Sequence, residues 1–150
     1  MGWNLAPDEG GYDLYTKLPD HLWLRGSDGE YCTVHDKWKI FDLSQPEMVT
    51  RWLDAMVRQP LASGAIDGIF VDSANLKVGN GQWMSCNGSI PSATATKWNA
   101  AHAKLFPAAQ KIFGDNGIVL ANNMDFPQPD GSPVLDANPF FNFRANIMAS

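Results

Sequence analysis

Apolar residues recur at helical spacing in two stretches of the chain. The first stretch follows Ser44-Gln45-Pro46-Glu47, which fits a capping box, and its apolar positions are Met48, Val49, Trp52, Leu53, Met56 and Val57. Pro60 and Gly64 are expected to end this helix. A second helix is expected over residues 94–113, kinked or split by Pro107, with one apolar face formed by Trp98, His102, Leu105, Ala109 and Ile112.

Short apolar runs without polar alternation predict strands that are buried on both faces. Such strands are expected over residues 67–72 and 118–123, and residues 22–26 are expected to form a further strand. Helices that alternate with buried strands indicate parallel βαβ units with right-handed crossovers. The predicted fold class is therefore α/β, in one domain over residues 1–150.

Charge and residue content narrow the classes of function. With 11 basic and 16 acidic residues, the net charge of −5 argues against nucleic acid as a partner. No apolar stretch reaches the roughly 20 residues of a membrane span, and residues 1–10 show no signal peptide. The two Cys and three His are too widely spaced for a zinc site, and no Gly-rich phosphate motif precedes a helix. Neither a metal nor a cofactor is therefore expected.

Polar residues follow the predicted strands at the end where parallel α/β folds place their functional sites. Asp72 comes directly after the apolar run 69–71 and is the candidate catalytic carboxylate, able to act as nucleophile or general base. The candidate substrate-binding residues are Arg25, Asn75, Trp83, Asn122, Asn123 and Asp125. Several have a structural alternative: Asp72 as the cap of the next loop, Asn122 and Asn123 as turn residues, and Trp83 as an apolar plug.

Three motifs occur in a suggestive order: Phe41-Asp42-Leu43-Ser44-Gln45-Pro46-Glu47, then Trp52-Leu53, then Gly68-Ile69-Phe70-Val71-Asp72-Ser73. Together they resemble the (β/α)8-barrel glycoside hydrolases of the α-galactosidase-like and α-glucosidase-like clan, over roughly residues 22–123. The resemblance implies that Asp72 is the nucleophile that cleaves O-glycosidic bonds in a carbohydrate substrate. It also implies an acid/base residue on a later strand. Asp42 marks the helix entry in this pattern and is expected to be a cap or turn residue.

Two other classes of function compete with the hydrolase. One is a non-catalytic carbohydrate-binding relative of the barrel enzymes, in which Asp72 only bonds ligand hydroxyls. The other is an unrelated doubly wound α/β domain with a small-molecule site at its strand ends. His102 shares the apolar face of the second helix and is expected to be a core residue.

Cys32 and Cys86 follow successive predicted strands, so a barrel would bring both loops to the same face. We expect these two cysteines to approach each other as a disulfide, which would suit an extracellular glycosidase.

A complete barrel needs about 250 residues, so a chain of 150 residues is expected to form an incomplete one. Expressed alone, it should be poorly soluble or oligomeric, because open sheet edges and unpartnered apolar helix faces associate. It should also fail to hydrolyse aryl glycosides. Size-exclusion chromatography with a glycosidase assay checks both points, and an active, cooperatively unfolding monomer would contradict them.

Overall fold

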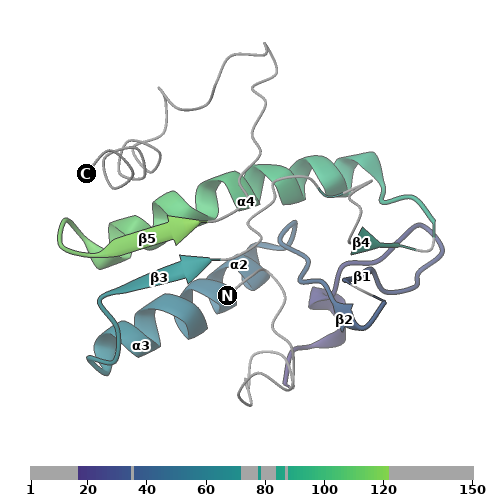
Figure 1. The fold of residues 1–150 in the computed structure, drawn as a ribbon. Helices are drawn as coiled ribbons and strands as arrows, with labels where there is room; N and C mark the ends of the chain where they lie inside the picture. Colours follow the sequence, from purple (N-terminus) through teal and green to yellow (C-terminus); the bar gives the residue numbers. More distant parts are fainter. Residues whose placement is uncertain (1–16, 35, 72–77, 79–83, 87, 122–150) are drawn as a thin grey trace, which may run out of the picture.

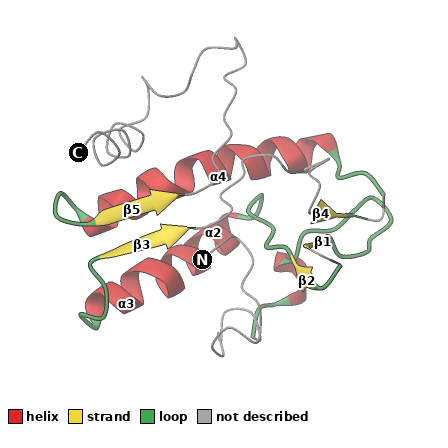
Figure 2. Cartoon of the chain, in the orientation of Figure 1, coloured by secondary structure: helices red, strands yellow, loops and turns green. Residues whose placement is uncertain are grey.

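The computed structural model describes residues 17–34, 36–71, 78, 84–86 and 88–121. These residues form two parts: a pair of parallel strands packed with helices, and a small antiparallel unit (Figure 1). Figure 2 shows long helices beside the two strands of the first part, and short strands linked by loops in the second. The predicted α/β class is confirmed at this level, with one sheet of two strands and one of three among the described residues.

The parallel pair consists of β3 (Gly68–Val71) and β5 (Ile118–Ala121), joined by the long helix α4 (Ser92–Phe113). The register runs from Gly68 opposite Ile118 to Val71 opposite Ala121, so the two strands begin and end together. This arrangement confirms the parallel βαβ unit that the alternation of helices and apolar runs predicts. It also places the two carboxyl ends side by side.

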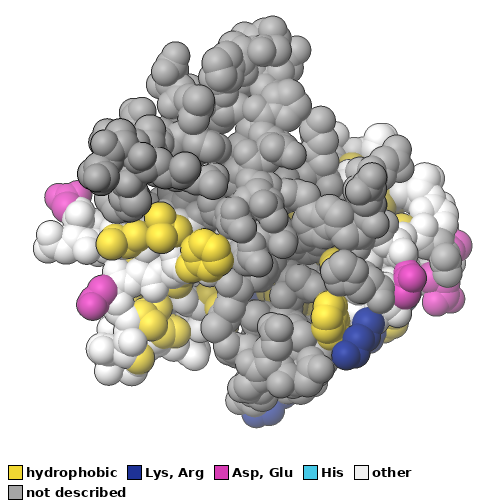
Figure 3. Space-filling model, in the orientation of Figure 1, with side chains coloured by type: hydrophobic (Ala, Val, Ile, Leu, Met, Phe, Trp, Pro, Cys, Tyr) yellow, Lys and Arg dark blue, Asp and Glu magenta, His cyan; other side chains and the backbone are white. Residues whose placement is uncertain are grey.

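Side-chain alternation gives the parallel pair one buried face and one exposed face. Val71 and Val119 are each 2% exposed and join the core with helix residues, whereas Phe70 is 54% exposed and Ile118 44%. The expectation that both faces are buried is therefore wrong, because the helices pack on the face of Val71 and Val119 alone. Figure 3 shows apolar side chains at the surface over β3 and β5.

The first helical stretch is continuous from α2 (Pro46–Leu53) through a π-helical turn, η2 (Asp54–Arg58), into α3 (Gln59–Ala62). The helix ends at Ala62, between Pro60 and Gly64 as expected, although it passes through Pro60 itself. Proline lacks the amide for a normal helical bond and its ring crowds the carbonyl four residues earlier, and a widened turn before it relieves both problems. Gly64 follows the helix with a φ of +70°, a conformation that suits glycine.

The expected capping box does not form. Gln45 is the N-cap and makes no side-chain cap bond, while Glu47 instead pairs with Arg51 at 2.9 Å and with His21 at 3.2 Å. The turn into α2 is held by Asp42, whose carboxylate accepts from the Ser44 amide at 3.0 Å. Asp42 is therefore the turn residue that the sequence predicts, and it takes over the role expected of Ser44.

Helix α4 begins two residues earlier than expected and runs unbroken past Pro107. Its predicted apolar face is confirmed: the buried residues are Trp98, His102, Leu105, Phe106 and Ala109, with Ile112 partly buried. Pro107 lies exposed on the opposite side, so its ring meets solvent rather than the sheet. No helix in the described ranges is long and apolar enough to cross a membrane.

Residues 22–26 belong to the antiparallel unit, which corrects their expected place in the parallel sheet. After a 3₁₀ turn, η1 (Asp20–Leu22), Trp23 bridges Phe41 and Arg25 bridges Tyr31, both antiparallel. The unit also contains β1 (Thr33–Val34), which pairs antiparallel with β2 (Trp38–Lys39) on one side and β4 (Met84–Ser85) on the other. From here the antiparallel unit means residues 22–34 and 36–42.

In the antiparallel unit, buried and exposed side chains alternate along the chain, as expected for extended backbone. Five of its even-numbered apolar residues face the core at 5% exposure or less, and Trp38 is partly buried; the five are Leu22, Leu24, Cys32, Val34 and Ile40. Odd-numbered residues such as Arg25, Tyr31 and Lys39 lie partly exposed on the other face. Trp23 hides this alternation in the sequence, because it is buried by stacking on Phe41 at 5.4 Å.

The close approach of β3 and β5 requires glycine at position 68. A Cβ built there would lie 2.2 Å from the carbonyl oxygen of Ile118, which is backbone and cannot swing away. We expect Gly68→Ala to lower the free energy of unfolding by about 2 kcal/mol or more, since one strand must shift. Urea unfolding measures this, with the exposed helix residue Ala103→Gly as a control near the ordinary propensity cost of about 1 kcal/mol. A neutral Gly68→Ala would contradict the described register.

Candidate active site

The carboxyl ends of β3 and β5 are the natural place for a site. Val71 and Ala121 are register partners, so the chain leaves both strands at adjacent points. In parallel α/β folds, side chains and loops at this end build the functional site. Asp72 and Asn122 come next in the sequence, and they lie outside the described residues together with Asn75, Trp83, Asn123 and Asp125. The catalytic and binding roles expected of these residues stay predictions.

The antiparallel unit lies beyond these strand ends. The arrows of β3 and β5 point toward β1, β2 and β4, while α2 and α4 start on that side and run back (Figure 1). A buried hydrogen bond fixes the arrangement: the indole N–H of Trp98, near the start of α4, donates to the carbonyl of Phe41 at 2.9 Å. The segment that precedes α2 thus forms a structure beyond the carboxyl ends of β3 and β5.

Arg25 belongs to this unit and its guanidinium is engaged within it. It donates to the carboxylate of Asp20 at 2.6 Å and to the carbonyl of Gly29 at 2.5 Å, and it stacks 4.0 Å above the ring of Tyr31. The Tyr31 hydroxyl also donates to Asp20, and these bonds from Tyr31 and Arg25 hold the pKa of the Asp20 carboxyl below its usual value. Arg25 therefore lies in a local ion-pair cluster, not at the end of a parallel strand.

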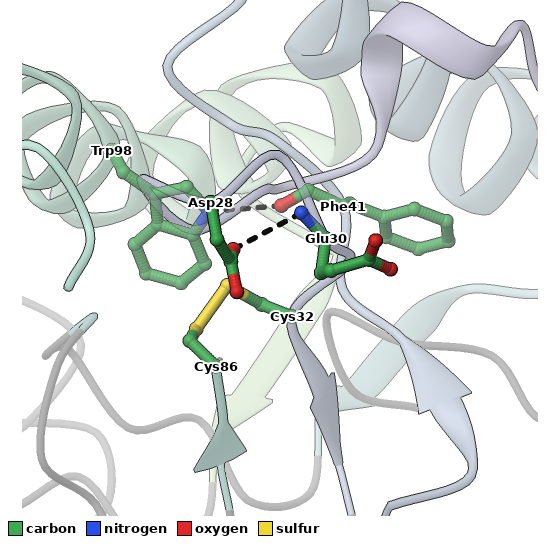
Figure 4. Close-up of a disulfide and its surroundings, with 6 residues drawn as sticks. All are labelled: Asp28, Glu30, Cys32, Phe41, Cys86 and Trp98. Atoms are coloured by element: carbon green, nitrogen blue, oxygen red, sulfur yellow. Dashed lines mark hydrogen bonds between the residues drawn. A yellow bond between two sulfur atoms is a disulfide. The ribbon is translucent and has the colours of Figure 1, made fainter. Parts of the chain in front are cut away.

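Cys32 and Cys86 form a disulfide, as expected (Figure 4). Their Cα atoms are 4.3 Å apart, and the bridge closes a separation of 54 residues. Cys32 is fully buried in the core and Cys86 is partly buried. The bridge thus joins the antiparallel unit, which precedes α2, to the connection between β3 and α4. Each of these two segments leads into a helix.

Further contacts hold the same connection in place. Its backbone pairs with β1 through β4, with Thr33 opposite Ser85 and Val34 opposite Met84. Val78, which is 6% exposed, donates its amide to the side-chain oxygen of Asn99 on α4 at 3.0 Å. Sequence reasoning missed Asn99, because a lone Asn on a helix beside a Trp carries no pattern that marks it as an anchor.

His102 is a core residue, as the sequence predicts. It is fully buried on α4, with its ring stacked on Trp98 at 5.0 Å and edge-on to Phe106 at 5.1 Å. Neither ring nitrogen has a hydrogen-bond partner in the described part of the chain. Burial alone lowers the pKa of His102 to about 3, so the imidazole is neutral at physiological pH.

No three His, Cys, Asp or Glu side chains gather as a metal site within the described ranges. No protein-family model matches the chain, and no curated protein matches it. A functional assignment therefore depends on the residues and their placement.

The buried His102 should make stability depend on pH. In the unfolded chain the pKa of His102 lies near 6.5. Between pH 6.5 and 3 the imidazole is therefore protonated in the unfolded state and neutral in the folded state. We expect the free energy of unfolding to fall as pH drops through this window, with a contribution of up to about 1.4 kcal/mol per pH unit.

His102→Phe keeps an aromatic ring between Trp98 and Phe106 and should remove this contribution, whereas His21→Gln, at an exposed site, should keep it. Urea unfolding at several pH values compares the variants. Equal pH slopes in the wild type and in His102→Phe would show that His102 titrates normally in the folded state.

Proposed function

We propose that the chain is part of a (β/α)8-barrel glycoside hydrolase, with Asp72 as the nucleophile at the carboxyl end of β3. The observation that carries the proposal is the placement of β3 and β5. Their carboxyl ends are adjacent, and the sequence continues from them with Asp72 on one strand and Asn122-Asn123 on the other. A carboxylate at a strand end can supply one of the two carboxyl groups that glycoside hydrolysis requires, and amide side chains can bond sugar hydroxyls.

The exposed apolar face of the parallel pair supports the barrel. In a closed barrel the helices lie outside, and the opposite face of each strand fills the interior with large apolar side chains. Val71 and Val119 pack against the helices, while Phe70 and Ile118 lie on the other face. These two exposed side chains are of the kind that a barrel interior uses.

An apolar groove beside β3 supports the same proposal. It encloses about 470 Å³ between the helix that precedes β3, through Trp52, Met56 and Pro60, and the strand itself. Its lining within the described residues includes all of β3 and no residue of β5, so it lies away from the β3–β5 pairing. In a barrel each strand has a neighbour on both sides, and this groove is where the neighbour that precedes α2 would lie.

The proposed chemistry needs two carboxyl groups. Asp72 would attack the anomeric carbon and form a glycosyl-enzyme ester, while an acid from a later strand protonates the departing oxygen. Water then cleaves the ester with that second residue acting as base. An inverting reaction would use the same pair at a wider separation, with Asp72 activating water instead.

The disulfide supports an extracellular setting for this activity. Disulfides persist in oxidising compartments and are rare in reducing ones. The Cys32–Cys86 bridge lies partly in the buried core, where it stabilises the fold by restricting the unfolded chain. A secreted enzyme that acts on carbohydrate outside the cell fits this chemistry.

In the full-length protein, Asp72→Asn should keep the fold and lower kcat/KM on aryl glycosides by orders of magnitude, because an amide cannot form the ester intermediate. The matched control is Asp67→Asn, an exposed carboxylate just before the opposite end of the same strand, which should retain near-normal turnover. Circular dichroism verifies the fold of both variants. Near-normal hydrolysis by Asp72→Asn would sink the catalytic role, and sugar binding without hydrolysis by the wild type would favour a carbohydrate-binding protein.

A further inference from the structure

The connection between β3 and α4 is fastened to the antiparallel unit along its described part, residues 84–86 and 88–91, which we call the tethered segment. At one end β4 pairs with β1, and next to that pair Cys86 is bonded to Cys32. Further along, the amide of Ser27 donates to the carbonyl of Ser89 at 2.9 Å. Covalent and backbone bonds therefore hold the segment at three successive points.

Gly88 shows how closely the two surfaces meet. It has a φ of +86°, and a Cβ built there would lie 2.8 Å from the hydroxyl oxygen of Ser27 and 3.4 Å from the amide nitrogen of Asp28. Only a residue without a side chain adopts this conformation at this distance without strain. Beside the disulfide, the backbone of Gly88 thus packs closely against both the side chain of Ser27 and the backbone of Asp28.

The antiparallel unit is in turn fixed to the helices. Trp98 bonds the carbonyl of Phe41, and Asp42 holds the turn from which α2 begins. The bridge therefore adds a covalent link between the tethered segment and a unit that is itself joined to the helices (Figure 4). A loop that is ordered before a ligand arrives does not have to be ordered at binding, and this preorganisation increases affinity.

We propose that the Cys32–Cys86 disulfide is a specificity-determining tether that holds the tethered segment and the antiparallel unit together as one wall of the substrate site. This inference depends on the proposed hydrolase function and adds the substrate class, an oligosaccharide. The wall stands beyond the strand ends rather than on β3, so it contacts sugar units away from the cleaved bond. Cys32 and Cys86 act as positioning residues and take no part in bond cleavage.

Variants that lack the disulfide test whether it affects substrate binding, measured by KM, without affecting bond cleavage, measured by kcat. Cys86→Ser removes it and leaves Cys32 to fill its own buried place, while Cys32→Ala removes it from the other side. In the full-length protein both variants should raise KM for an oligosaccharide by about tenfold or more, with kcat within about threefold of the wild type. On an aryl glycoside of a single sugar of the same kind, KM and kcat should each change by less than about threefold.

Gly88→Ala provides a second, independent variant, because it keeps the disulfide and disturbs the contact with Ser27. It should raise KM for the oligosaccharide in the same direction by a smaller factor, and it decides the question if the cysteine variants do not fold. Ser92→Ala, at the exposed first residue of α4, is the control and should behave like the wild type. Equal losses on both substrates, or an unchanged KM for the oligosaccharide, would overturn the proposal.

Hydrogen exchange separates failure of the tether from failure of the hydrolase. In Cys86→Ser the amides of the tethered segment and β1 should exchange faster, while those of β3 and β5 keep their protection. If the bridged wild type hydrolyses no glycoside, the proposed function fails, whatever the exchange result. If exchange in the tethered segment is unchanged by the substitution, the tether itself fails.

Discussion

The hydrogen bond from the Trp98 indole to the Phe41 carbonyl is the contact on which the arrangement of the two parts depends. It is buried, and it joins residues 57 positions apart in the sequence. Farther along the same helix, Leu105 and Ala109 join the core that also holds Val119 of β5. Helix α4 therefore contacts both the parallel pair and the antiparallel unit and fixes the distance between them. If the buried Trp98 donor lost its acceptor, the free energy of unfolding would fall by about 1–3 kcal/mol.

This arrangement assigns different tasks to the two parts. The parallel pair supplies a fixed edge, because its strands share register from the first residue to the last. The antiparallel unit supplies a surface beyond that edge, and its short strands are joined by turns, which tolerate variation better than strands do. In barrel proteins, such a division combines a constant reaction centre with a variable binding surface.

The elements whose apolar residues follow one regular pattern along the sequence were predictable. Helical spacing gave α4 and its face from Trp98 to Ala109, and two apolar runs gave the parallel strands. The antiparallel unit was misassigned because Trp23 makes residues 22–24 uniformly apolar, and the partner on which it stacks, Phe41, lies far along the chain. The continuation through Pro60 was missed because a π-helical turn leaves no mark in the sequence. The disulfide was predicted correctly but on a premise that the structure corrects, because residues 22–26 before Cys32 are not a parallel strand. The anchor Asn99 and the Asp20–Arg25–Tyr31 cluster depend on tertiary contacts.

The burial of Cys32 has a consequence for biosynthesis. Its partner is made 54 residues later, which at about 5–20 residues per second leaves the first thiol waiting for roughly three to eleven seconds. Once the antiparallel unit closes, Cys32 is fully enclosed and no oxidoreductase can reach its sulfur. The thiol must therefore meet an oxidant or Cys86 while the unit is still open. Chaperones that keep nascent segments accessible would therefore increase the fraction of chains in which the Cys32–Cys86 bridge forms.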